Sequence, residues 1–351
     1  MTLGRLSPDQ PATRLAVGLA IALAIAAGLV VAAGADPLAA LAAMGEGAFG
    51  ERYVIAETLI QATPLALVAL GVAPAVRAGV FTIGSEGQLV AGAAAATAAI
   101  GAIGPAPAPV LLAVGLAAGV LGGAAWALPA AVMRAYFRVN DVLSTLLLNY
   151  IAGYGLLLLL KTGLAAHAMV AVPRSDALPA AALLPKLIEG TRLHAGVVAA
   201  PLAAVLLAWW LRSPRGLVYD AFASRPGLAA RLGLAEPRAV WTTMLISGAA
   251  AGLVGWMQVA GVAGTLYPSV GGGLGFSGIL VAMLGGLRPL GILAMALALG
   301  ALTTGADGLQ IGTGVPASLS IVVQGLLLLV AALAFNGRAR PALAAPAEPS
   351  R

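Results

Sequence analysis

The residues best suited to chemistry lie in a short stretch, Gly79–Gln88, between two long apolar runs. This stretch holds Glu86, Gln88 and three glycines. A carboxylate at the depth of a lipid bilayer is costly and usually functional, for example as a proton carrier or as part of a substrate path. Glycines interrupt helices, and an interrupted helix at membrane depth is tolerated where protein or a cavity surrounds it. We therefore expect Glu86 to anchor a broken-helix joint beside a path across a membrane.

A second interruption, Gly271–Gly278, is also rich in glycine and lies in the other half of the chain. Paired interruptions are typical of inverted repeats with a translocation path at their interface. Asn149, deep in an apolar run, either lines that path or forms a hydrogen bond between helices. A path with few ionisable residues suits a neutral substrate, because amide and aromatic groups bind a sugar or a base without a fixed countercharge. The residues predicted to lie near the path are Glu86, Gln88, Asn149, Phe276 and Ser277.

Sequence patterns of common enzymes are absent. The chain has no Gly-x-x-x-x-Gly-Lys-Ser/Thr loop to cradle ATP phosphates and no His-Glu-x-x-His zinc motif. It has no cysteine, and its two histidines, His167 and His194, fall in or beside a long loop, as solvated residues do. We expect a chain that is not an enzyme and that holds no cofactor and no metal. The net charge of +6 reflects membrane topology rather than a nucleic-acid partner.

The composition is that of a membrane protein. Hydrophobic residues make up 61% of the 351 residues and charged residues 9%, whereas soluble domains carry roughly 25% charge. Apolar runs of transmembrane length recur along the chain. They predict an all-α polytopic membrane protein with about ten transmembrane helices, including broken or re-entrant segments near 276–305. The expected spans are 14–34, 54–76, 88–104, 109–133, 142–163, 194–211, 239–262, 276–287, 289–305 and 315–335.

The basic residues predict the orientation of these spans. With a cytoplasmic N-terminus, 14 of the 19 Lys and Arg residues fall on the cytoplasmic side, as the positive-inside rule requires. The chain then divides into a cytoplasmic N-terminus (1–13), a transmembrane domain (14–336) and a disordered cytoplasmic tail (337–351). The expected outer loops are 35–53 and 164–193.

Small residues recur every four positions in two of the expected spans. One span holds Gly115, Gly119 and Gly123, and another holds Gly248 and Gly252. This spacing lets helix backbones approach closely in lipid. We interpret these glycines as packing positions without a direct functional role.

The longest expected cytoplasmic connection, 213–236, is basic and amphipathic. Pro226 is suited to the first turn of a short helix. The segment is either a plain basic loop or a docking helix for a cytoplasmic partner, and its length and apolar content favour docking. The residues predicted to make that contact are Asp220, Phe222, Ser224, Arg225, Pro226 and Arg231.

Two segments resemble motifs of one known family. Gly79–Gln88 reads GVFTIGSEGQ and resembles the G-x-F-N-I-G-x-E-G-Q motif of bacterial ABC importer permeases for nucleosides and simple sugars, which are related to branched-chain amino acid permeases. Asn140–Ala152 reads NDVLSTLLLNYIA and resembles the N-E-V-I-S-T-L-M-L-N-Y-I-A segment of the same family. The likeness continues through Gly275–Ile279 to about residue 330.

The chain departs from the family pattern at several positions. Thr82 stands where the family usually has asparagine, and Asp141 replaces a glutamate. In the 213–236 loop the family reads close to R-A-V-G-x-N-P-x-A-A-x-Y-A-G-I, whereas Arg225 here replaces the asparagine and Arg231 the tyrosine. These departures imply a specialised pairing between this loop and its partner.

The resemblance implies a non-catalytic transmembrane permease subunit of an ATP-binding cassette importer in the bacterial cytoplasmic (inner) membrane. Two permease chains, the second a different one, would pair with cytoplasmic ATP-binding subunits and an extracytoplasmic substrate-binding protein. ATP hydrolysis in the partner would move the 213–236 loop and drive alternating access. The implied substrate is a nucleoside, with ribose- or galactose-type sugars as the alternative.

Two other functions stay open from the residues alone. A stand-alone, proton-coupled secondary transporter would use Glu86 or Asp307 as its proton site and would need no partner. A membrane scaffold without a transport role would tolerate changes at Glu86 and Asn149.

Overall fold

The computed structural model describes residues 11–166 and 172–314, and a few positions between 316 and 326. The start of the expected N-terminal segment, His167, most of the expected span 315–335 and the expected tail 337–351 lie outside the described residues. Within the described ranges the chain is helical, and its only extended pairing is an isolated antiparallel bridge between Lys186 and His194. The prediction of an all-α protein is therefore confirmed.

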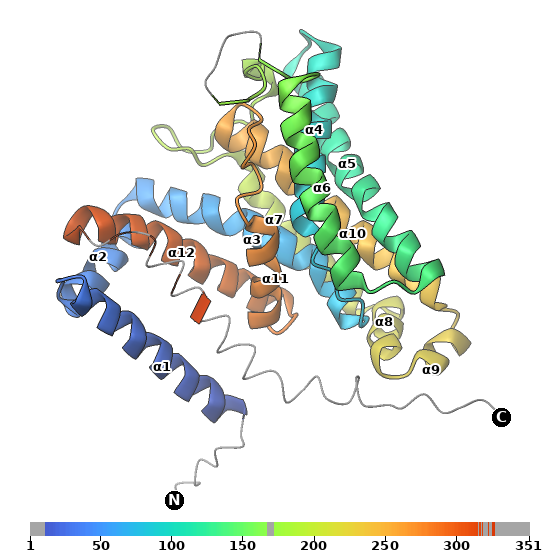
Figure 1. Ribbon diagram of the computed structural model, residues 1–351, viewed down its shortest axis with the longest axis horizontal. Coiled ribbons are helices and arrows are strands. Elements are labelled where there is room, and N and C mark those ends of the chain that lie inside the picture. The colour runs from blue at the N-terminus through green and yellow to red at the C-terminus, as the bar shows by residue number, and fades with distance from the viewer. Residues whose placement is uncertain are drawn as a thin grey trace, which may run out of the picture. The chain divides into compact units, whose positions relative to one another are not determined.

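Twelve α-helices make up most of the described chain (Figure 1). A π-helix, η3 (Gln258–Ala263), directly follows α10, and two short 3₁₀ turns, η1 (Ala180–Ala182) and η2 (Ala195–Val198), precede α7. The α-helices are α1 (Pro11–Ala32), α2 (Pro37–Phe49), α3 (Arg52–Arg77), α4 (Ser85–Ile103), α5 (Ala108–Phe137), α6 (Asp141–Lys161), α7 (Ala199–Arg212), α8 (Pro214–Ser224), α9 (Pro226–Arg231), α10 (Glu236–Met257), α11 (Leu274–Leu284) and α12 (Pro289–Thr313).

Seven of the described helices are long and apolar enough to cross a membrane, or up to eight if the bent pair of α1 and α2 counts as one span. The expected count of about ten spans is therefore not confirmed. Helix α11, in the expected span 276–287, is too short for a full crossing because a helix rises only about 1.5 Å per residue. The expected outer loop 35–53 contains helix α2, which begins at Pro37 because Asp36 accepts hydrogen bonds from the first-turn N–H groups of Leu38 and Ala39.

The chain forms two compact units, 1–58 with 298–351 and 59–297. In the first unit, α2 packs against the C-terminal part of α12 through two glycines, since a Cβ added at Gly47 would lie 2.6 Å from the Cα of Gly308. The hydroxyl groups of Thr58 and Thr304 lie 2.6 Å apart and share a hydrogen bond. The candidate functional residues lie in the second unit, apart from Asp307 in the first.

Helices α4, α5 and α10 pack through backbone rather than through large side chains. A Cβ added at Gly123 would lie 2.2 Å from the carbonyl oxygen of Gly248, and one added at Gly92 would lie 2.4 Å from the Cα of Gly252. The three helices run side by side in Figure 1, with α6 along α4. The predicted packing role of the spaced glycines is confirmed here.

Two breaks interrupt the helices of this unit, and each overlaps in part the interruption that the sequence predicts. The predicted positions 85–88 and 274–278 are already helical, because α4 begins at Ser85 and α11 at Leu274. The first, 78–84, joins α3 to α4. It begins because Gly79, at a left-handed φ of 75°, lets the N–H groups of Gly79 and Val80 bond back to Val76 and Ala75, which is a helix-ending Schellman motif. The second, 264–273, joins η3 to α11 and also contains left-handed glycines. The inverted repeat that the two breaks suggest stays a prediction.

Candidate functional site

Glu86 joins the two breaks. It lies in the first turn of α4, and its carboxylate accepts hydrogen bonds from the backbone N–H groups of Gly273 (3.0 Å) and Gly275 (2.8 Å) at the start of α11. A negative group at a helix N-terminus is stabilised by the helix dipole as well as by these two donors. No described lysine or arginine forms an ion pair with Glu86. The joint therefore supplies backbone amides, rather than a cation, as the partner of this carboxylate.

Two glycines, one in the second break and one at the start of α11, make this approach possible. A Cβ added at Gly275 would lie 2.2 Å from the backbone nitrogen of Glu86, and one added at Gly271 would lie 2.2 Å from a carboxylate oxygen of Glu86. No other residue type leaves room for the carboxylate at these two positions. The glycine run that the sequence predicts as an unwound joint thus also forms the binding site for the Glu86 carboxylate of α4.

Asn149 of α6 braces the first break. Its side-chain oxygen accepts from the Gly87 N–H (2.8 Å), and its side-chain nitrogen donates to the Ile83 carbonyl (2.9 Å). One turn earlier on α6, the Thr145 hydroxyl accepts from the Ile83 N–H (3.1 Å). Broken helices in lipid need such internal partners for their freed backbone groups. Of the two interpretations that the sequence left open for Asn149, the structure shows the hydrogen bond between segments.

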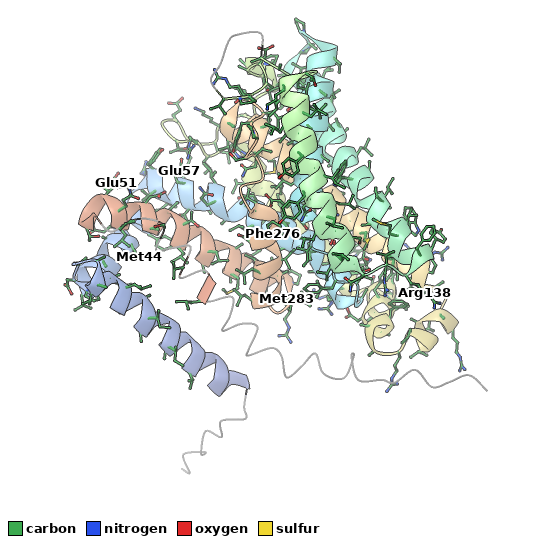
Figure 2. The ribbon with its side chains drawn as sticks, viewed as in Figure 1. Met44, Glu51, Glu57, Arg138, Phe276 and Met283 are labelled. Carbon is green, nitrogen blue, oxygen red and sulfur yellow. The ribbon has the colours of Figure 1, made fainter. Side chains whose placement is uncertain are left out.

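The other predicted path residues lie around this joint. Gln88 is buried and accepts from the Ser247 hydroxyl of α10 (3.2 Å). Phe276, labelled in Figure 2, and Ser277 follow Gly275 in the first turn of α11. The side chain of Phe276 is 42% exposed. Thr145 and Ser247 are not among the residues predicted from the sequence. The spacing of Thr145 and Asn149, four residues apart on one helix face, is a signal that could have found the first of them.

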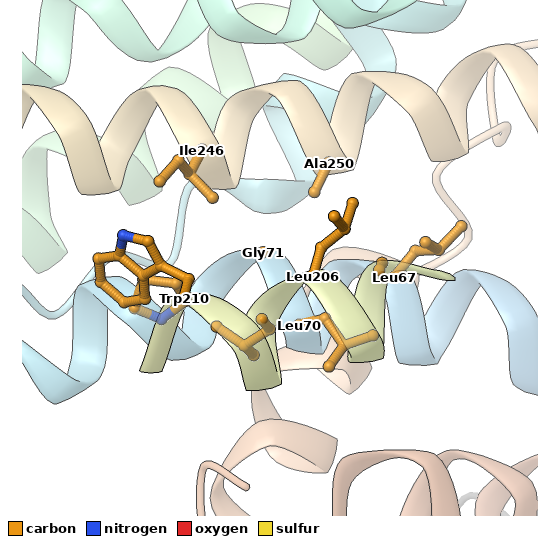
Figure 3. Close-up of a pocket in the computed structure, with 10 residues that line it drawn as sticks. Leu67, Leu70, Gly71, Leu206, Trp210, Ile246 and Ala250 are labelled. Atoms are coloured by element: carbon orange, nitrogen blue, oxygen red, sulfur yellow. The ribbon is translucent and has the colours of Figure 1, made fainter. Parts of the chain in front are cut away.

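Two apolar cavities lie outside this polar joint. One of about 230 Å³ lies among α3, α7 and α10, with Leu67, Leu206 and Trp210 in its wall (Figure 3). The other, of about 260 Å³, lies among α4, α5 and α6 and is lined in part by Trp126. None of the five predicted path residues lines either cavity. Their apolar walls offer little to the hydroxyl groups of a sugar.

The predicted docking loop forms two short helices, α8 and α9, and α9 begins at Pro226 as predicted. Its apolar side packs on the unit, because Tyr219 and Ala229 are buried in a cluster with Ala78 and Ala239, at the ends of α3 and α10. Phe222 packs against the same cluster. The other side of the loop is exposed and includes Ser224, Arg225, Pro226 and Arg231.

Arginines connect the helix ends at this side of the unit. Arg77, in the last turn of α3, forms a bidentate ion pair with Asp220 of α8 through its Nε (2.7 Å) and Nη2. Its Nη1 also donates to the carbonyl of Leu287 (3.3 Å) in the turn between α11 and α12. Arg134 of α5 lies within ion-pair distance of Asp141 (3.2 Å) and Glu236 (3.4 Å), although the contact with Asp141 lacks hydrogen-bond geometry. The sequence pattern indicates membrane topology at these arginines but not these contacts.

The loop before α7 is hydrogen-bonded to the second break. The Leu266 N–H donates to the Ser175 hydroxyl (2.9 Å), the Leu178 N–H donates to the Gly264 carbonyl (2.8 Å), and the Leu184 N–H donates to the Ala260 carbonyl (2.9 Å). The loop and Glu86 therefore both supply hydrogen-bond partners to the backbone of this break.

His194, at the end of this loop, is buried rather than solvated, so that expectation is wrong. Its Nδ1 accepts from the Gly196 N–H (3.2 Å), and its ring packs so closely on η3 that a Cβ added at Gly261 would lie 2.6 Å from Nε2. Burial lowers the pKa of His194, because an imidazolium would lose its hydration.

Comparison with known proteins matches this chain to one family. The family model described as the permease component of branched-chain amino acid transport systems matches residues 54–332. That range includes both breaks, the joint between them and the helices α8 and α9.

Several relatives are similar along nearly their whole length. The guanosine ABC transporter permease protein of Bacillus subtilis is 34% identical over 90% of this chain and 92% of the relative. The glucose ABC transporter permease protein of Haloferax volcanii is 31% identical over 88% and 83%. The nucleoside ABC transporter permease protein of Lactococcus lactis is 27% identical over 88% and 86%. No solved structure matches the chain.

Proposed function

The chain belongs to the family of permease components of branched-chain amino acid transport systems, and on this premise we propose that it carries nucleosides through the membrane for an ATP-driven importer. The family is that of ABC transporter permeases, which are non-catalytic membrane subunits. The family that the motifs resemble, and the expectation of a subunit that is not an enzyme, are thus confirmed. The substrate, the partners and the transport cycle are the proposal.

The observation that carries the proposal is the polar joint of Glu86, Asn149 and Gln88. It lies between two broken helices, and broken helices mark the path in repeat-built transporters. The carboxylate of Glu86 is held by two backbone amides without a cation. With this carboxylate engaged by backbone amides, the other polar side chains of the joint are the neutral amides of Asn149 and Gln88, which suit an uncharged solute such as a nucleoside.

The same geometry argues against a stand-alone proton-coupled transporter. Both carboxylate oxygens of Glu86 are engaged by the backbone N–H groups of Gly273 and Gly275, which gives this side chain a structural role at the start of α11. Asp307, the other candidate, is exposed on α12. We therefore favour the ATP-driven importer over a proton-coupled transporter.

Nucleosides are favoured over simple sugars because two of the relatives named above are permeases for guanosine or nucleosides. The similarity to the glucose permease from Haloferax volcanii supports a simple sugar as the alternative substrate. We propose that α8 and α9 meet a cytoplasmic ATP-binding subunit through exposed residues such as Arg225 and Arg231. A second, different permease chain and an extracytoplasmic binding protein would complete the complex in the cytoplasmic membrane, with both termini of this chain in the cytoplasm.

Reconstitution tests this function directly. The chain would be placed in vesicles with its ATP-binding subunit, second permease and binding protein, and uptake of labelled guanosine and glucose would be measured. We expect guanosine uptake that requires ATP and every partner. Uptake by the lone chain that follows a proton gradient would overturn the proposal, and ATP-driven uptake of glucose alone would change the substrate.

The absence of cysteine makes the proposed orientation testable. Single cysteines at Ser224 and at Glu189, introduced into the natural background, would be labelled with a membrane-impermeant maleimide. We expect the first to react only in inside-out vesicles and the second only in intact cells.

A further inference from the structure

We propose that Arg77 is a positioning residue that ties the ATPase-facing loop to two membrane segments at once. Its guanidinium holds Asp220 of α8 on one side and the Leu287 carbonyl, between α11 and α12, on another. Arg77 itself is part of α3. This inference rests on the proposed function, because it assigns a route for the movement that an ATP-binding subunit would impose on α8.

The geometry of the contact between Arg77 and Asp220 suits it to transmit movement from α8 to α3. Asp220 is engaged by two nitrogens of one planar guanidinium, which fixes direction as well as distance. A lysine in place of Arg77 would supply one point charge and could not hold Asp220 and Leu287 in the same arrangement. A displacement of α8 along this pair must therefore move the end of α3.

The third contact of Arg77 extends the route to α12. The turn 285–288 is tight, and Leu287 has a left-handed φ of 57°, a strained conformation for a branched residue. Such conformations persist where the surrounding structure holds them in place. The bond from Arg77 to the Leu287 carbonyl is one such restraint, so a movement of Arg77 reaches the start of α12 as well as α3.

A partly exposed ion pair usually adds little to stability, and the side chains of Arg77 and Asp220 are 24% and 30% exposed. The inferred role is therefore in coupling rather than in folding. Asp220 was predicted to contact the ATPase, and here it faces its own chain.

The test uses the complete reconstituted complex and measures nucleoside uptake and ATP hydrolysis in the same vesicles. We expect Arg77→Gln and Asp220→Asn each to lower uptake per ATP hydrolysed by about tenfold, the rate equivalent of one lost charge-assisted hydrogen bond. The double variant should lose no more than either single variant, because the two residues act as a pair. The matched control is Arg288→Gln, which removes an exposed arginine at the end of the same turn and should leave the ratio unchanged.

A second readout separates positioning from folding and from the proposed function. In the full chain in nanodiscs, amide hydrogen exchange in α8 and in 285–288 should be faster in Arg77→Gln than in Arg288→Gln, while the two unfolding midpoints agree. Equal exchange rates, an unchanged ratio in both single variants, or losses that multiply in the double variant would each overturn the inference. If the wild-type complex shows no ATP-driven uptake, the proposed function fails, and the exchange measurement still decides whether Arg77 holds these segments.

Discussion

The two breaks look alike in sequence, yet different parts of the chain hold them. The first, 78–84, is short, and α6 closes it through Asn149 and Thr145. The second, 264–273, is longer, and a carboxylate from α4 and a loop from outside the helices close it together. The comparison indicates that a glycine-rich segment determines where a helix ends. Side chains from distant parts of the chain then determine the backbone conformation of the break.

One residue connects the two breaks. Glu86 lies two residues after the first break and accepts hydrogen bonds from backbone N–H groups at the start of α11, just after the second. Loss of the Glu86 carboxylate should therefore loosen the start of α11, whereas loss of a brace on the first break that leaves Glu86 in place should not. We expect the two breaks to respond differently when the residues that hold them, Glu86, Asn149 and Ser175, are replaced one at a time.

Removal of Glu86 should have the largest effect on this comparison. Glu86→Ala leaves the N–H groups of Gly273 and Gly275 without their charged acceptor. At about 1–3 kcal/mol for each buried unsatisfied donor, we expect a loss of about 3 kcal/mol in the free energy of unfolding in detergent. Glu46→Ala, at an exposed position of α2, is the matched control and should change it by less than about 0.5 kcal/mol. Equal stabilities of the two variants would show that Glu86 does not brace the second break.

Asn149 should affect the first break alone. Asn149→Leu removes one acceptor and one donor from the joint, and we expect a loss of about 2 kcal/mol. Hydrogen exchange should rise at Ile83 and Gly87 and stay unchanged in 264–273. Asn149→Asp keeps the acceptor for the Gly87 N–H but cannot donate to the Ile83 carbonyl, so its loss should be intermediate. Faster exchange in both breaks would contradict the separate bracing described here.

The loop brace on the second break should contribute less. Ser175→Ala removes the single hydroxyl that accepts from the Leu266 N–H, and we expect a loss of about 1 kcal/mol. Faster exchange at Leu266, with Ile83 unaffected, would locate the change. Ser224→Ala on α8 is the control, since its hydroxyl is exposed and should matter little. If the Leu266 N–H exchanges at the wild-type rate in Ser175→Ala, the loop does not stabilise the second break.

The smallest expected effect is a dependence on pH at His194. Burial lowers the pKa of His194 in the folded chain, so the unfolded chain takes up the proton first as the pH falls below about 6.5. The free energy of unfolding should therefore be flat above this pH and decrease below it, through the lowered pKa of the folded state. His194→Asn can still accept from the Gly196 N–H and should remove this part of the slope. The same slope in both proteins would assign it to another group.

Sequence alone supplied the features that depend on local residue type. Gly79 ends α3, Pro226 begins α9, and glycines spaced four apart predict where helices touch. The helix α2 was missed, although Asp36 followed by Pro37 is a capping signal, because alternating spans required a loop there. The partners of Glu86 could not be predicted, because Gly273 and Gly275 lie 187 and 189 residues away in the chain. The contacts of Arg77 could not be predicted for the same reason, because Asp220 and Leu287 lie far from it in the chain. The arginine by itself indicated only the membrane topology.

The backbone contact among α4, α5 and α10 has a consequence for how this gene can change. At Gly123 and Gly252 a single added carbon meets backbone atoms of the neighbouring helix closer than 3 Å. Every amino acid that one nucleotide change can reach from a glycine codon carries at least that carbon. Every single-nucleotide substitution that changes the amino acid at these positions should therefore disturb the helix packing. Gly153 and Gly155 on α6 have open space around them and should tolerate substitution.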